Sequence, residues 1–131
     1  MNTIKNILAI LFITTATIVA AQDNTQALIP YPNHIEQCNN GKTFRFNSST
    51  TISTNLPNDA FAIEELQRIT KKRLGLSPII DNSHRKNIIS LKVDSTITGR
   101  EHYILKVDKN GVFIKGATQG ALFLALQTLD Q

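Results

Sequence analysis

The segment from Tyr103 to Gly116 constrains the fold more than any other part of the sequence. Apolar and polar residues alternate up to Asp108, which is the period of a strand with one buried face. Asn110-Gly111 is a tight-turn signal, which we expect to place Gly111 at positive φ, and Val112-Phe113-Ile114 returns the chain. The sequence therefore predicts a β-hairpin over residues 103–116.

A helix is expected to follow, running from Gln119 toward Leu129 with Thr118 as its N-cap. One apolar stripe faces the sheet, Phe123 lies on its flank, and Leu124 is nearly opposite. A helix that is apolar on both sides is usually buried on both sides, so we expect its second side to need a partner outside this chain. The helix reaches Asp130-Gln131 without a stop signal, so we also expect the sequence to be cut off inside a helix. The sheet-facing stripe consists of Leu122, Ala125, Leu126 and Leu129.

An earlier helix is predicted to begin after Pro57-Asn58-Asp59, where Asn58 or Asp59 can cap the first turn. Lys71-Lys72-Arg73 falls in its last turn, where positive charge suits the helix dipole. We interpret this triplet as a solvated helix end rather than a nucleic-acid patch. Gly75 can adopt the left-handed conformation that ends a helix, and Pro78 prevents continuation. The core-facing residues recur at spacings of three and four: Ala62, Ile63, Leu66 and Ile69.

Several other stretches have extended character. Proline pushes the residue before it toward extended geometry, which applies to the prolines at 30 and 32. Phe44 and Phe46 share one face of an alternating segment, as in a half-buried strand. The sequence predicts these further extended segments: Leu28–Pro32, Ile35–Cys38, Thr43–Asn47 with a continuation to Thr54, Ile79-Ile80 and Asn87–Val93.

Residues Met1 to Ala21 have the layout of a secretory signal peptide. Lys5 gives a short basic region, an apolar core follows, and the small residues Val19-Ala20-Ala21 precede the polar Gln22. The apolar core is short and interrupted by threonines, so we expect cleavage after Ala21 rather than a retained membrane anchor. Residues 22–27 are then a polar leader ahead of one domain over residues 28–131.

Composition allows one modest core after cleavage, because 131 − 21 leaves 110 residues. Cys38 is the chain's one cysteine, so it can form no internal disulfide, and we interpret it as a structural thiol. Export without a disulfide framework fits a bacterial periplasm or the cell exterior. A formal net charge of +4 with 6% aromatic residues does not argue for nucleic-acid binding.

The sequence shows no catalytic, cofactor-binding or metal-binding constellation. Glu64 and Glu65 are adjacent on a helix and point about 100° apart, whereas a glycosidase needs two carboxyl groups that face one bond. There is no phosphate-cradling glycine loop and no nucleophile elbow. From the residues alone we expect an exported α+β domain in which one apolar helix side has no partner within the chain. We expect it to contain neither catalytic residues, a cofactor nor a metal. The histidines, which lack the spacing of metal ligands, are His34, His84 and His102.

The sequence resembles a known family at both of its ends. Leu28-Ile29-Pro30-Tyr31-Pro32 resembles the opening of the N-terminal domain of family 20 glycoside hydrolases, the β-N-acetylhexosaminidases and chitobiases. The segments 101–107, 111–117 and 119–129 are similar to that domain's C-terminal block, which ends in Gln-Thr-Leu. The resemblance covers residues 28 to 131. One departure is Ala125, where the family usually has glycine.

The resemblance implies a small α+β domain, with two helices packed on one face of a mostly antiparallel sheet. It also implies a neighbour, because in this family the domain precedes a (β/α)₈ barrel. The barrel carries an adjacent Asp-Glu pair, and the acetamido oxygen of the substrate acts as the nucleophile. None of these residues can be carried over to this chain. We expect the barrel, or another protein, to contact the last helix at Phe123 and Leu124.

Three hypotheses therefore stand after the sequence analysis. The chain is the accessory domain of a secreted β-N-acetylhexosaminidase that removes terminal N-acetylhexosamine from glycans, or it is a free-standing exported interaction module. A third hypothesis makes it an enzyme in its own right. The DNA downstream separates the first two, because an in-frame or frameshifted barrel supports the accessory domain. We expect no nucleic-acid partner, and no membrane contact after cleavage.

Overall fold

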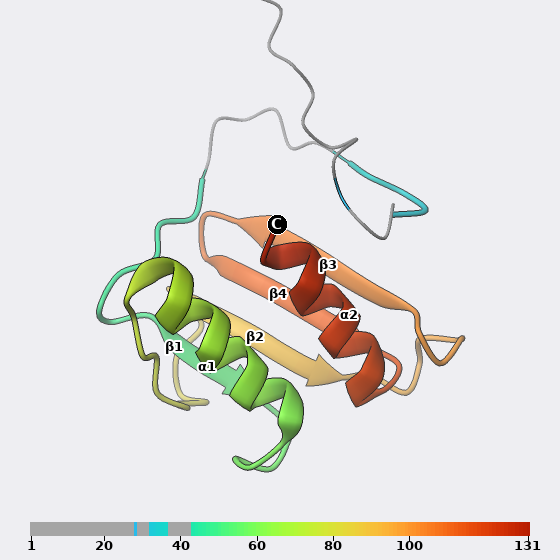
Figure 1. The fold of residues 1–131 in the computed structure, drawn as a ribbon, viewed down its shortest axis with the longest axis horizontal. Coiled ribbons are helices and arrows are strands. Elements are labelled where there is room, and N and C mark those ends of the chain that lie inside the picture. The colour runs from blue at the N-terminus through green and yellow to red at the C-terminus, as the bar shows by residue number, and fades with distance from the viewer. Residues whose placement is uncertain (1–27, 29–31, 37–42) are drawn as a thin grey trace, which may run out of the picture.

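The computed structural model describes residues 28, 32–36 and 43–131 of the chain (Figure 1). They form a four-stranded sheet with two helices side by side on one of its faces (Figure 1). The α+β class predicted from the sequence is confirmed. The elements follow one another as β1 (Thr51–Thr54), α1 (Phe61–Leu74), β2 (Ile88–Val93), β3 (Tyr103–Asp108), β4 (Gly111–Gly116) and α2 (Gln119–Leu129).

The sheet is mixed, which corrects the mostly antiparallel sheet that the resemblance implied. Its strand order is β1-β2-β4-β3, and both the β1–β2 and the β2–β4 pairs are parallel. The physical reason is that α1 forms the crossover between β1 and β2, and such a crossover joins parallel strands. From β2 the chain passes to the outer edge and forms β3. The β3–β4 pair is antiparallel, so the hairpin over residues 103–116 is confirmed.

The core lies between the sheet and the two helices. Ile52, Ile89 and Val112 lie in register on three adjacent strands and are at most 1% exposed. Each such side chain contributes about 1.5–3 kcal/mol when it is removed from water. The stripes predicted for both helices supply the opposite wall of this core, with these residues fully buried: Ala62, Ile63, Leu66, Leu122, Ala125 and Leu126.

The helix ends agree with the sequence in all but one place. Gly75 has φ 68° and ends α1 after the basic last turn, and Thr118 accepts a hydrogen bond of 3.1 Å from the backbone of Ala121 at the start of α2. The capping of α1 by Asn58 or Asp59 is wrong. Ala60 occupies the N-cap without a side-chain hydrogen bond, and its carbonyl accepts from the backbone N–H groups one turn later.

Gly111 also differs from the prediction, because its φ is not positive. The glycines with positive φ in the described chain are Gly75 and Gly99. Gly111 is needed for a different reason: a Cβ at this position would lie 2.1 Å from the carbonyl oxygen of Ile88 on β2. The turn itself is held by Asp108, whose carboxylate accepts from the backbone N–H of Asn110 at 2.8 Å.

The predicted strand Thr43–Asn47 is not a strand, because these residues make no ladder with the sheet. The alternation nevertheless identified the inward side chains, since Phe44 and Phe46 are half-buried against the core with ring centroids 4.8 Å apart. Ile80 is extended and bridges Ile52 at the edge of β1, as its pattern suggested.

Other sequence predictions fall largely outside the described residues. These are the signal peptide, the polar leader, most of the proline-rich entry segment, and Cys38. Ile35 and Glu36, at the start of the short strand predicted up to Cys38, are not in a strand. In the part of the chain that the structure describes, neither helix is long and apolar enough to cross a membrane.

Candidate docking face on the two helices

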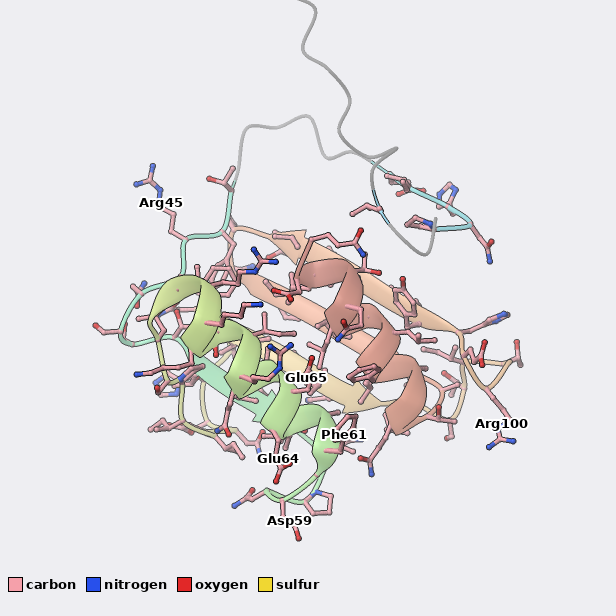
Figure 2. All side chains as sticks on the ribbon, in the orientation of Figure 1. Arg45, Asp59, Phe61, Glu64, Glu65 and Arg100 are labelled. Atoms are coloured by element: carbon pink, nitrogen blue, oxygen red, sulfur yellow. The ribbon has the colours of Figure 1, made fainter. Side chains whose placement is uncertain are left out.

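The side of α1 and α2 that points away from the sheet is the candidate functional surface. Figure 2 looks onto this side, with Phe61 and Glu65 on the part of α1 nearest α2. The helices run parallel in register there, since Phe61 meets Phe123 and Glu65 meets Gln127 one turn later. We call this surface the outer helical face and define it by Phe61, Glu65, Arg68, Phe123, Leu124 and Gln127.

One end of the outer helical face is apolar. The Phe61 and Phe123 rings lie 5.2 Å apart between centroids, at an interplanar angle of 33°. Phe61 is the more open of the two, with 58% of its surface exposed, whereas Phe123 and Leu124 are half-buried. Phe61 and Phe123 thus form a contiguous apolar patch that extends over both helices.

The middle of the outer helical face is polar and fixed in place. Glu65 accepts two hydrogen bonds of 2.7 Å from Arg68, and one of 2.9 Å from the side-chain amide of Gln127. The Arg68 guanidinium, together with Gln127, lowers the pKa of Glu65, although partial burial opposes this effect. Glu65 therefore joins α1 to α2 as an ionised group.

A second polar link joins the far ends of the helices. Arg73 donates to the carboxylate of Asp130 and to its backbone carbonyl, each at 2.6 Å. The Arg73 guanidinium holds the pKa of Asp130 below its usual value. The two helices are thus joined by side-chain hydrogen bonds at two places, and their outer side has an apolar end and a hydrogen-bonded middle.

The sequence placed Phe123 and Leu124 on the side of α2 that was expected to need a partner outside this chain, but it did not point to Phe61. In the structure Phe123 packs on Phe61, and Phe123 and Leu124 are half-buried. Phe61 was missed because it lies outside the buried stripe of α1. An apolar residue at the first position of a helix and off its core-facing stripe is the signal that could have found it.

Glu64 and Glu65 are adjacent in α1, but their side chains have different surroundings. Glu64 is exposed, and Figure 2 shows it at the lower end of α1, while the Glu65 carboxylate accepts hydrogen bonds from Arg68 and Gln127. These two carboxylates therefore do not face each other across one site.

Asp81, Ser83 and His84 lie close together and include the three residue types of a catalytic triad, but they are not arranged as a triad. The Nδ1 atom of His84 lies 3.1 Å from the carboxylate of Asp81 and 3.4 Å from Oγ of Ser83. A triad needs its serine and its carboxylate on different ring nitrogens. Here Ser83 donates to Asp81 at 2.6 Å, which lowers the pKa of Asp81 and stabilises a loop turn.

The histidines lie apart from one another. His34 pairs with Glu36 at 2.9 Å, His84 belongs to the loop turn, and the His102 ring is next to Gly99. Within residues 28, 32–36 and 43–131, no group of three histidine, cysteine or carboxylate side chains is arranged to hold a metal ion.

The fold is a two-layer α+β domain, with both helices on one face of the sheet. Residues 25–131 match the model of glycosyl hydrolase family 20, domain 2. The chain therefore belongs to glycosyl hydrolase family 20, and the resemblance seen in its sequence is confirmed.

Solved structures show the same fold. An exo-β-N-acetylglucosaminidase of this family from Vibrio harveyi, solved with N-acetylglucosamine, matches with a TM-score of 0.65 at 23% identity over 80% of this chain. A β-N-acetylhexosaminidase from Streptomyces coelicolor A3(2) matches with a TM-score of 0.62 at 23% identity, also over 80%. The chain spans 16% and 21% of those two chains, respectively. A search of curated proteins gives no match.

Proposed function

We propose that this chain is the accessory domain of an exported β-N-acetylhexosaminidase, and that its outer helical face packs against a (β/α)₈ catalytic barrel. The enzyme so formed removes terminal N-acetylhexosamine from glycans. The barrel supplies the reacting carboxylates, and the domain described here supports the barrel from one side. The observation that carries the proposal is the outer helical face of a family 20 domain, with Phe61 58% exposed beside Phe123.

Two further observations support this assignment. Most of each matched hexosaminidase chain lies outside the region shared with this chain. The polar links at Glu65 and Arg73 also fix the helices before docking, so a barrel meets a preorganised surface and little conformational entropy is lost on association.

The proposal assigns no chemistry to this chain alone. Purified residues 22–131 should give no hydrolysis of a chromogenic N-acetylglucosaminide above a buffer blank. A catalytic domain from a family 20 enzyme, assayed in parallel, provides the positive control. Turnover that survives repurification, and that is lost in the Glu64→Gln or the Glu65→Gln variant, would overturn the assignment to an accessory role.

The gene neighbourhood tests the partner. We expect the DNA that continues from this coding sequence to encode a (β/α)₈ barrel with an adjacent Asp-Glu pair, in frame or after a frameshift. An unrelated gene at that position would favour a free-standing interaction module instead.

Export is the remaining part of the proposal, and it rests on the sequence of residues 1–21. Mass spectrometry of the protein recovered from a bacterial periplasm or medium should give a mature chain that begins at Gln22. Recovery of the uncleaved chain from the cytoplasm alone would contradict it.

A further inference from the structure

β3 forms one edge of the sheet, and in the described residues it pairs with β4 alone. Alternate residues of an antiparallel edge strand direct their N–H and C=O groups away from the sheet, ready for another strand. β3 also carries exposed apolar side chains on both faces, because Ile104 is 57% exposed and Val107 is 47% exposed. This edge therefore combines free backbone groups with apolar surface.

Symmetry limits how a second copy of the chain can pair with this edge. A two-fold axis perpendicular to the sheet keeps the helices of both copies on the same side, so facing residues must belong to the same face of the strand. One residue of β3 then lies opposite the same residue of the second copy, and we name the axis by that residue. An axis at Lys106 would place two like charges opposite each other, which destabilises a cross-strand pair. An axis at Ile104 would place Lys106 opposite His102.

An axis at Leu105 pairs every residue from Tyr103 to Val107, with Ile104 facing the aliphatic part of Lys106 on the side away from the helices. Leu105 then faces its own copy, and Tyr103 faces the apolar Val107 on the helix side of the sheet. At the ends, Asp108 faces His102. An axis at Val107 would pair Lys106 with Asp108 but would leave Tyr103 beyond the overlap, so fewer strand residues would be paired.

We propose that β3 is a self-association edge, through which two copies of this chain pair antiparallel about a two-fold axis at Leu105. The two four-stranded sheets then form one continuous sheet, and the outer helical face of each copy stays open. The proposal is independent of docking to a barrel. A six-residue strand buries less than the roughly 1,200–2,000 Å² of a standard interface, so the dimer is weak and concentration-dependent.

Disulfide trapping tests the position of the axis. The cysteine variants are made in the full chain with Cys38→Ser. A cysteine introduced at the axis lies opposite the same residue of the second copy, at the Cα separation that a disulfide requires. A cysteine introduced one residue away from the axis lies too far from its equivalent in the second copy. Under mild oxidation we expect Leu105→Cys to give at least fivefold more covalent dimer than Ile104→Cys or Lys106→Cys. Equal trapping at all three positions, or none at any, would overturn the proposal.

Sedimentation of the cysteine-free chain gives a second test, because Leu105 is partly buried and its substitution can affect folding. The chain should dimerise progressively toward millimolar concentration, and Val107→Lys should weaken this by at least tenfold. Ile79→Lys, which changes a 68% exposed residue away from β3, is the matched control and should have no effect. Phe61→Ser should also leave the edge dimer intact, which separates this proposal from docking at the helices. A strictly monomeric chain, or equal effects of Val107→Lys and Ile79→Lys, would contradict the proposal.

Discussion

Phe61 at the start of α1 and Phe123 in α2 stack at a centroid distance of 5.2 Å, although 62 residues separate them in sequence. Each ring covers part of the other, so neither helix alone forms the apolar end of the outer helical face. The contact lies one turn before the Glu65–Gln127 hydrogen bond, and the two interactions together fix the helices in parallel register. A partner that docks there recognises the pair of helices rather than a single one.

The two leucines of α2 at positions 124 and 126 should respond differently to the same change. Leu126 is fully buried, so Leu126→Gln places an unpaired amide in the core and should cost about 3 kcal/mol or more. Leu124 is half-buried on the outer side, so Leu124→Gln should cost about 1 kcal/mol or less. Thermal melts measure both. Equal costs would mean that α2 is buried on every side within this chain.

The Glu65 carboxylate makes the helix pairing dependent on pH. Its pKa is lower in the folded chain than the ordinary value of 4.5, chiefly because of Arg68, so ionisation stabilises the fold. This contribution is fully present above the unfolded pKa and is lost as the pH falls through the lower, folded value. Glu65→Gln should therefore be less stable than the native chain at pH 7 and should lose less stability between pH 6 and pH 3. Urea titrations at several pH values measure this. Parallel losses in both proteins would show that other carboxylates dominate.

Two glycines should differ sharply in their tolerance of alanine. At Gly111 a Cβ would lie 2.1 Å from the carbonyl oxygen of Ile88, so Gly111→Ala must separate β4 from β2 and should cost about 3 kcal/mol or more. At Gly75 there is open space but φ is 68°, so Gly75→Ala should cost only about 1 kcal/mol. The free energy of unfolding of each variant distinguishes a steric requirement from a conformational one.

Local patterns predicted most of the helices and strands. The stripe of α1, its end at Gly75, the Thr118 cap and the β3–β4 hairpin all depend on residues close in sequence, and all are present. The parallel pairing of β1 with β2 could not be found in this way, because it depends on which strands α1 connects. The N-cap position of Ala60 could not be predicted either, because alanine has no side-chain group that caps a helix.

The candidate surface was only partly predictable for the same reason. The apolar outer side of α2 is visible in its sequence, whereas the covering of Phe123 depends on a residue of the other helix. Phe61 is therefore the residue that the tertiary structure adds to the surface. The sequence singled out Glu65 only as a neighbour of Glu64, whereas in the structure its carboxylate links α1 to Gln127 of α2.

Phe61 should matter for docking far more than for folding. Since it is 58% exposed, Phe61→Ser should change the free energy of unfolding by about 1 kcal/mol or less. Burial of the exposed part of this ring at an interface contributes roughly 0.9–1.7 kcal/mol, which corresponds to about 4–20-fold in affinity. Ile79→Ser removes an apolar side chain that is 68% exposed and lies away from α2, and it serves as the control. A large loss of stability in Phe61→Ser would show that the ring is needed for the fold itself.

The most direct measurement is a calorimetric titration of this chain into the (β/α)₈ barrel that the proposed function pairs with it. We expect saturable one-to-one binding, weakened about 4–20-fold by Phe61→Ser and also reduced by Leu124→Gln, with Ile79→Ser unchanged. Such a result would locate the interface on the outer helical face. Absence of binding, or binding that neither Phe61→Ser nor Leu124→Gln alters, would contradict the central claim that this face holds the catalytic domain.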